Sequence, residues 1–158
     1  MKTSKIHMAQ VTDQKMIFKW FQKFARAYFG HKIDTKRSRF LDPNLNKFIF
    51  AFQGSIPIGF VRISCKSDLC NTVMWYINDA YVRPGYRSKG ILKMLISKCV
   101  SDYNCGYILL SYDRVIKHLF YYAALGFIHQ IQHPDKTLRY LATQQFIDLL
   151  NSNTRAAA

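Results

Sequence analysis

The stretch "VRPGYRSKGILKMLISKC" (Val82–Cys99) decides the fold that we expect for this chain. Pro84 and Gly85 end an apolar segment, and an apolar stripe with the period of a helix begins near Gly90. A strand, turn and helix joined in this way leave backbone N–H groups unpaired at the helix start. This junction is typical of an anion site. Basic side chains that simply extend into water are the alternative interpretation.

The segments on either side of the junction predict an α/β (α+β) domain. We expect helices at about 13–29, 90–100, 113–125 and 144–150, and strands at 47–52, 56–64, 72–82, 107–112, 127–132 and 138–143. In the third helix, the predicted inner face consists of Val115, Ile116, Leu119, Phe120 and Ala123. The basic segment 31–44 is irregular or forms a short second helix. The order predicts a mixed, largely antiparallel sheet flanked by helices, with one strand-helix-strand crossover.

Length and composition favour a single domain over residues 1–150, followed by a tail, 151–158, whose "TRAAA" end could derive from a vector. We see no secretory signal and no run near the roughly 18 apolar residues of a membrane span, so we expect a cytoplasmic location. The four cysteines lack the spacing of a zinc site and predict reduced thiols, with no metal bound.

The charge balance is strongly positive. Lysine and arginine total 23 against 9 acidic residues, a net charge of +14, and every acidic residue is an aspartate. Such a field favours polyanionic partners, among them RNA, an acidic protein or a phosphorylated cofactor. A basic surface without a polyanionic partner is the alternative.

Two motifs near the junction resemble those of the GNAT superfamily of N-acetyltransferases. Val82, Pro84, Arg87 and Gly90 match the family pattern V-x-P-x-x-[QR]-x-x-G-x-[GA], while Leu92 stands where the family has Gly or Ala. About 30 residues further on, "YYAALGF" (121–127) is similar to the family motif F-Y-x-x-L-G-F. The two motifs fall in the family's order on the predicted strand-helix-strand-helix segment.

The resemblance implies a GNAT-like sheet with a splayed central strand and acetyl-CoA as the acetyl donor. The implied cofactor-binding residues are Ala80, Tyr81, Val82, Arg87, Ser88, Lys89, Gly90, Ile91 and Leu92. A backbone N–H of the segment 80–82 is the candidate donor to the acetyl carbonyl oxygen. The motif assigns Tyr122 as the acid that protonates the departing sulfur, although Tyr121 or Tyr112 could be confused with it.

Direct attack by an amine also needs a general base, and the family's usual glutamate does not occur in this sequence. Asp79 is the natural substitute, since it lies three residues before Val82 among apolar neighbours. A structural role, in which the Asp79 carboxylate accepts a hydrogen bond from a loop amide, is an equal alternative. His118, His31 and a relay of water molecules remain open as well.

The acceptor is predicted to be a primary amine. In the family the acceptor enters beside the first helices and the last hairpin, here residues 20–45 and 128–140, and the first of these segments is aromatic and basic. This favours an amine on an anionic macromolecule such as aminoacyl-tRNA or an acidic protein over a small polycation. A homodimer is compatible with the sequence. The competing functions are an acetyl-CoA-binding regulator and an RNA-binding module with the same fold and no catalysis.

Overall fold

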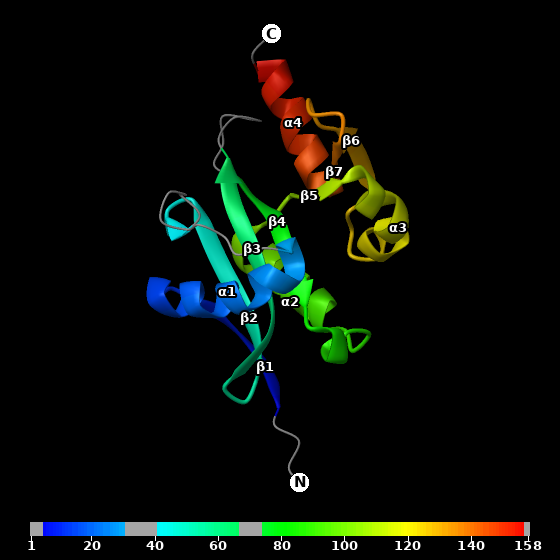
Figure 1. Ribbon diagram of the computed structural model, residues 1–158. Helices are drawn as coiled ribbons and strands as arrows, with labels where there is room; N and C mark the ends of the chain where they lie inside the picture. The colour runs from blue at the N-terminus through cyan, green and yellow to red at the C-terminus, as the bar shows by residue number, and fades with distance from the viewer. Residues whose placement is uncertain (1–4, 31–40, 67–73, 157–158) are drawn as a thin grey trace.

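The computed structural model describes residues 5–30, 41–66 and 74–156, which build one seven-stranded sheet (Figure 1). The strand order is β1-β2-β3-β4-β5-β7-β6. Neighbours pair in antiparallel fashion except for β4 and β5, which run parallel. The strands are β1 (Ile6–Val11), β2 (Asn46–Gln53), β3 (Ile56–Lys66), β4 (Met74–Val82), β5 (Tyr107–Ser111), β6 (His129–Gln132) and β7 (Leu138–Ala142). The predicted mixed, largely antiparallel sheet is confirmed.

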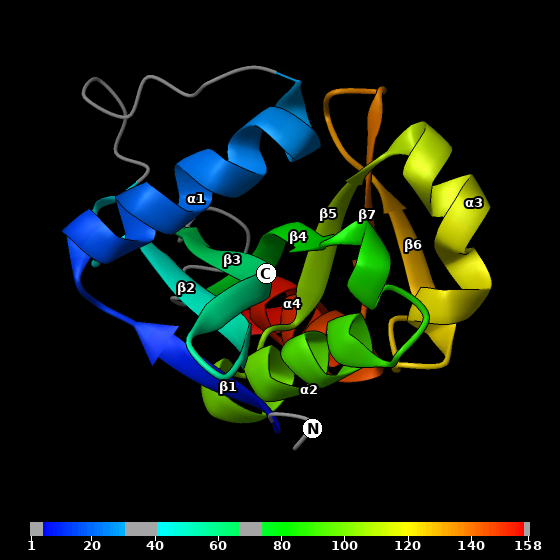
Figure 2. The ribbon, with the colours of Figure 1, turned by 60° about the horizontal axis from the view of Figure 1, so that its bottom comes forward.

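Helices cover both faces of this sheet. They are α1 (Gln14–Phe29), α2 (Ile91–Tyr103), α3 (Tyr112–Ala123) and α4 (Gln144–Ala156). α1 and α2 lie on opposite faces, and α3 stands beside the divergent ends of β4 and β5 (Figure 2). None of the helices in the described part of the chain is long and apolar enough to cross a membrane.

The first helix forms where its capping signals predict it. The Asp13 carboxylate accepts hydrogen bonds from the N–H groups of Lys15 and Met16, and Gly30 ends the helix with φ 75°. Between the caps, Phe21 and Phe24 are fully buried against phenylalanines of β2 and β3. This aromatic layer fixes α1 along the edge of the cavity described below.

The central strand β4 contains a bulge and then separates from its parallel neighbour. Arg62 of β3 pairs with Asp79 and the next residue, Ile63, pairs with Ile77, so Asn78 is the extra residue. In the described chain, β4 and β5 pair only through Tyr76 with Tyr107 and Ile77 with Ile108. β4 nevertheless continues to Val82. The sheet therefore opens beyond Ile77, as the predicted splayed strand requires.

A buried polar cluster holds β4 to β3 at the bulge. The Arg62 Nε donates to the Asp79 carboxylate at 2.5 Å, and another guanidinium nitrogen donates to the Asn46 side-chain oxygen at 2.8 Å and to the Ser64 hydroxyl at 3.1 Å. Asn46, Ser64 and Asp79 are each less than 9% exposed. The ion pair is thus shielded from water and hydrogen bonded on several sides, which is the condition under which a buried charge is tolerated.

Two local features differ from the sequence prediction, and a third prediction is not tested. The edge strand β1 was not expected, because its six residues do not alternate cleanly between inward and outward positions. α4 continues beyond 150 to Ala156. Residues 31–40, which include most of the irregular basic segment and the candidate base His31, lie outside the described residues.

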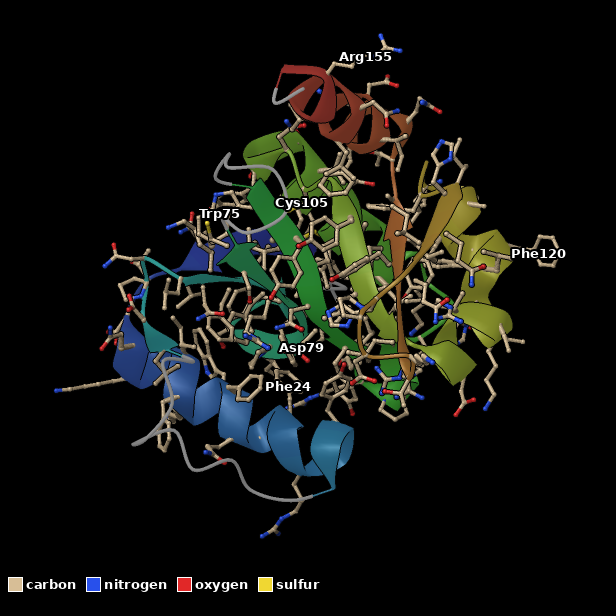
Figure 3. All side chains as sticks on the ribbon, turned by 90° about the horizontal axis from the view of Figure 1, so that it is seen from above. Phe24, Trp75, Asp79, Cys105, Phe120 and Arg155 are labelled. Atoms are coloured by element: carbon tan, nitrogen blue, oxygen red, sulfur yellow. The ribbon has the colours of Figure 1, made fainter. Side chains whose placement is uncertain are left out.

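The predicted inner face of α3 is wrong in two positions. Ile116 and Phe120 are 62% and 90% exposed, and Phe120 extends away from the molecule (Figure 3). Val115 is buried as predicted, and Tyr122 is buried as well, because packing of these two residues on the main core sets the rotation of the helix. α3 also begins at Tyr112, one residue before the predicted start, with Ser111 in the N-cap position.

We predict that Arg62→Ala lowers the free energy of unfolding by about 3–5 kcal/mol, because it leaves the buried Asp79 carboxylate without its partner. The matched control is Lys98→Ala, which breaks the exposed helical pair Lys98–Asp102 and should cost less than about 1 kcal/mol. Urea unfolding followed by circular dichroism measures both changes. Equal losses in the two variants would contradict a structural role for the buried cluster.

Candidate active site

A cavity of about 650 Å³ opens where β4 leaves β5. Its walls come from four elements that are distant in sequence. They are α1 (Ala27 and Tyr28), β4 (Ala80, Tyr81 and Val82), the turn with the first residues of α2 (Tyr86, Arg87, Ser88, Gly90, Ile91 and Leu92), and α3 (Arg114, His118, Tyr121 and Tyr122). The cavity therefore brings eight of the nine predicted cofactor residues together with the predicted acid.

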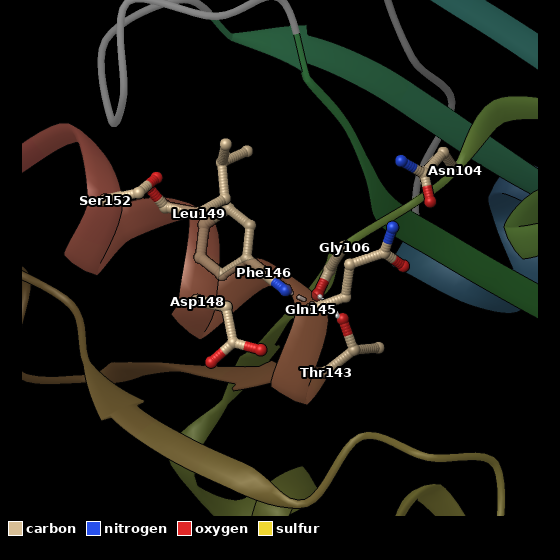
Figure 4. Close-up of a pocket in the computed structure, with 8 residues that line it drawn as sticks. All are labelled: Asn104, Gly106, Thr143, Gln145, Phe146, Asp148, Leu149 and Ser152. Atoms are coloured by element: carbon tan, nitrogen blue, oxygen red, sulfur yellow. Dashed lines mark hydrogen bonds between the residues drawn. The ribbon is translucent and has the colours of Figure 1, made fainter.

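A second cavity, of about 440 Å³, lies between α4 and the turn that leads into β5 (Figure 4). Its walls include Asn104, Thr143, Phe146 and Asp148. None of the residues predicted for catalysis or cofactor binding lines it. In the described residues, no group of three His, Cys, Asp or Glu side chains could hold a metal ion in either place.

The turn between β4 and α2 has the backbone geometry of an anion cradle. Residues 84–86 form a 3₁₀ turn, after which Ser88 and Gly90 adopt left-handed conformations with φ 60° and 74°. α2 has no side-chain cap at its first turn, so its first N–H groups are available to a ligand. A Cβ built on Gly90 would meet no atom within 4 Å. A ligand can therefore approach the backbone closely at Gly90.

The basic side chains of the turn do not extend freely toward the cavity. The Arg87 Nε donates to the Val82 carbonyl at 3.0 Å, and its guanidinium lies 5.7 Å from the centre of the Tyr81 ring. The Lys89 ammonium donates to the Gly85 carbonyl at 3.1 Å, and Lys89 is the one predicted cofactor residue that does not line the cavity. Both cations bind carbonyl oxygens of the turn, so backbone N–H groups form most of the cradle.

Tyr122 lies at the deep end of the cavity, and it is only 7% exposed. Burial, followed by the nearby hydroxyls of Tyr121 and Tyr28, raises its pKa to about 12, while Arg114 acts in the opposite direction. The phenol is therefore protonated throughout the neutral range. A protonated hydroxyl in this position can donate a proton to a leaving group.

Asp79 does not line the cavity. Its carboxylate is paired with Arg62 beneath the α1 face of the sheet (Figure 3). Its partner is a side chain of β3 and not the loop amide considered from the sequence. His118 does line the cavity, with its ring 6.5 Å from that of Tyr122.

The sequence reasoning missed Arg114 as a site residue. Arg114, His118 and Tyr122 are spaced four residues apart, so they form one row along α3. The signal was therefore present in the spacing, although the strongly apolar neighbours Ile116 and Phe120 obscured it. Trp20, expected at the acceptor entrance, packs instead on Phe50 and Phe52 in the core.

The mixed sheet, with a cavity where its central strand leaves its parallel neighbour, is the arrangement expected of the family that the two sequence motifs resemble. The sequence profile of the Acetyltransferase (GNAT) family matches residues 14–127, more than half of the chain. The chain belongs to the GNAT family of acetyltransferases, which use acetyl-CoA as the acetyl donor. None of the curated protein sequences gives a significant match.

Solved structures with the same fold share little sequence with the chain. A GNAT-family acetyltransferase from Staphylococcus aureus Mu50 has a TM-score of 0.61 at 18% identity, covering 89% of this chain and all of its own (100%). Arabidopsis thaliana NAA60, solved with a bisubstrate analogue, gives 0.63 at 15% identity, with 86% and 94% covered. An aminoglycoside N-acetyltransferase in complex with CoA gives 0.61 at 17% identity, with 77% and 88% covered.

We predict that Gly90→Ala raises the dissociation constant for acetyl-CoA at least about tenfold. An alanine at φ 74° is strained by roughly 1–2 kcal/mol, so the turn must rotate N–H groups away from the ligand. Gly85→Ala is the matched control, because a Cβ there also meets no atom within 4 Å and the φ angle carries no such strain. Isothermal titration calorimetry measures both, and unchanged binding by Gly90→Ala would contradict the cradle.

Proposed function

We propose that the protein transfers an acetyl group from acetyl-CoA to a primary amine by direct attack, with donor and acceptor bound together. The observation that carries the proposal is one cavity that joins the backbone cradle at α2 to the buried hydroxyl of Tyr122. Acetyl-CoA supplies an activated acetyl group as a thioester. The amine nitrogen forms a bond to the acetyl carbon as the carbon–sulfur bond breaks.

Proton transfers at both ends complete this reaction. The attacking ammonium must lose a proton before it can form the bond, and the departing sulfur must gain one. Tyr122 is the proposed donor to sulfur, since its hydroxyl is protonated and lies in the cavity. The ammonium thus loses two protons: the first passes through the base to solvent, and the second, lost as the amide forms, restores the Tyr122 hydroxyl. The overall products are an N-acetyl amine, free CoA and one proton.

A backbone N–H of the segment 80–82 is the proposed donor to the acetyl carbonyl oxygen. The three residues line the cavity, and the parallel pairing of β4 with β5 ends before them. Backbone groups that lack a strand partner are available to a ligand. A donor fixed in a strand stabilises developing negative charge without having to reorganise.

The general base stays a prediction. For Asp79, accepting a proton means giving up its ion pair with Arg62, since the pair depends on a negative carboxylate. His118 has direct access to an amine bound in the cavity, because its ring lines the cavity beside Tyr122. A water relay between the amine and either group needs no rearrangement of these contacts.

The proposed acceptor is an amine on an anionic macromolecule, an acidic protein segment or an aminoacyl-tRNA. Two arginines and no acidic side chain are found among the described residues that line the cavity, so a polycationic amine would be repelled there. Proteins of similar structure include a ribosomal-protein-alanine N-acetyltransferase and aminoglycoside N-acetyltransferases. The absence of lining carboxylates favours the first kind of acceptor for this chain.

We also propose that the enzyme acts in the cytoplasm. Cys65, Cys99 and Cys105 are free, and burial raises the pKa of the Cys105 thiol to about 12. A buried thiol with a raised pKa is unreactive and persists most readily in a reducing compartment.

The proposed reaction is tested with radiolabelled acetyl-CoA, the purified protein and a cell extract. Transfer of label to amines of the extract is expected, and extracts treated with RNase or protease beforehand separate tRNA-linked from protein acceptors. Label recovered only in small molecules would contradict a macromolecular acceptor. Label recovered only as acetate would contradict amine transfer itself.

We predict that Tyr122→Phe lowers kcat by about 10²–10⁴-fold, because the variant lacks the proton that the departing sulfur needs. Binding of acetyl-CoA should be retained, since the phenyl ring still fills the same buried position. Tyr121→Phe is the control on the adjacent residue, which is partly exposed, and it should retain most of the activity. Initial rates of CoA release measure kcat. A larger loss of kcat in Tyr121→Phe than in Tyr122→Phe would indicate that Tyr121 is the acid.

Asp79→Asn tests the predicted base, because an amide keeps the shape of the side chain but cannot accept the proton. We predict a fall in kcat/KM of about 10²–10⁴-fold near neutral pH. Part of this loss should recover at high pH, where solvent deprotonates more of the amine. His118→Gln should remain near the wild-type value. A larger fall in kcat/KM for His118→Gln than for Asp79→Asn would indicate that His118 is the base.

A further inference from the structure

The inference concerns Arg114, a cationic cavity residue that the proposed chemistry does not use. Arg114 lies in the first turn of α3 and is exposed at the cavity wall. One guanidinium nitrogen donates to the Tyr28 hydroxyl at 2.9 Å, and the guanidinium carbon lies 5.0 Å from the centre of the Tyr28 ring. α3 and α1 thus hold this cation between them.

Tyr28 connects the cation to the reacting segment of β4. Its hydroxyl has a backbone hydrogen bond with Ala80, in addition to the one from Arg114. Burial and the nearby Asp79 raise the pKa of Tyr28, so the phenol is neutral and does not cancel the positive charge of Arg114. The guanidinium therefore lies only two hydrogen bonds away from the strand proposed to hold the acetyl carbonyl.

The position of Arg114 separates it from the phosphate cradle. α3 runs from the C-terminal end of α1 toward the turn that precedes α2 (Figure 2). Arg114 lies near the N-terminal end of α3 and Tyr122 near its C-terminal end. Their separation of eight positions corresponds to about 12 Å of helix between their Cα atoms. The cradle lies on the Tyr122 side, so a ligand of Arg114 belongs to the acceptor half of the cavity.

The charge of Arg114 is not neutralised within the described chain. The ion pairs among the described residues are Arg62–Asp79 and Lys98–Asp102, and no acidic residue among them lines the cavity. A guanidinium is a planar fork that binds a carboxylate through two parallel hydrogen bonds. Because Tyr28 already holds the fork in place, little side-chain entropy remains to be lost on binding.

We propose that Arg114 binds a carboxylate of the acceptor that lies within one or two residues of the reacting amine. This inference rests on the proposed acetyl transfer and names its substrate class, an α-amine of a peptide whose first or second residue is acidic. An amine that reacts beside Tyr122 lies about 12 Å along α3 from Arg114. One residue of extended chain spans at most about 3.3–3.6 Å, so one or two residues, an acidic side chain and the arginine side chain together cover this distance. A free amino acid offers the same chemistry through its own carboxylate.

A panel of matched acceptors tests the proposal. Peptides that begin with Asp or Glu, or carry one at the second residue, are compared with otherwise identical peptides that have Asn or Gln there. Free aspartate and free alanine form a second arm. The KM of the acidic peptides should be about tenfold to hundredfold lower than that of their amide counterparts, which is the range of a charged hydrogen bond. Preference for free amino acids would identify the α-carboxylate as the ligand of Arg114.

Arg114→Gln should abolish this preference by raising the KM of acidic peptides about tenfold or more, without changing the KM of the amide peptides. Arg114→Lys keeps the charge without the fork and should retain part of the preference. Tyr28→Phe removes the hydroxyl that holds the guanidinium and should also weaken it. Lys117→Gln is the matched control, since it removes an exposed cation of the same helix that does not line the cavity.

Peptide binding measured by fluorescence anisotropy in the presence of CoA separates this proposal from the proposed reaction. If acetyl transfer fails but acidic peptides bind through Arg114, the reaction is wrong and the recognition is right. If transfer proceeds with equal KM for acidic and amide peptides, or if Arg114→Gln leaves the preference intact, the role of Arg114 is overturned. Stronger transfer to aminoacyl-tRNA than to every peptide would overturn it as well. Circular dichroism confirms that each variant is folded.

Discussion

The early end of the pairing between β4 and β5 is the constraint on which the site depends. A parallel pair normally continues as long as both strands do, because each unpaired N–H or C=O group loses a hydrogen bond. Here β4 continues for five residues beyond its last partner in β5. The strand is held to β3 instead, through Arg62 and Asp79 at the bulge and through the close approach of Gly59, where a Cβ would lie 2.8 Å from the Tyr81 carbonyl.

α3 converts this opening into a site with two chemically different ends. Its buried residues Val115 and Tyr122 dock on the core, and the same rotation turns Arg114 and His118 toward the cavity. The cost of that rotation is the exposure of Ile116 and Phe120. One helix therefore sets the distance between Tyr122, the proposed acid, and Arg114, the cation proposed to bind the acceptor.

Local patterns in the sequence were sufficient to predict most of the fold. The helix predicted at 13–29, the two strands predicted at 47–52 and 56–64 and the stop at Pro84 depend on neighbouring residues only, and the structure has them. The features that could not be predicted depend on distant partners. Asp79 meets Arg62 across 17 positions, and Arg114 meets Tyr28 across 86. The rotation of α3 likewise depends on its packing against the sheet. The spacing of apolar residues alone cannot specify this rotation, because α3 has two apolar stripes and either of them could face the core.

The positive charges at the positive end of α2 have a physical explanation in the turn itself. A lysine or arginine beside a helix N-terminus is unfavourable when its charge faces the dipole, by roughly 0.3–1 kcal/mol at an exposed site. Arg87 and Lys89 instead donate to the Val82 and Gly85 carbonyls, so each cation is satisfied by the negative end of a peptide group. They brace the turn, and this leaves the backbone N–H groups at the start of α2 for the proposed binding of the cofactor phosphates. Leu92, which stands where the family has a small residue, packs partly against the core and lines the cavity.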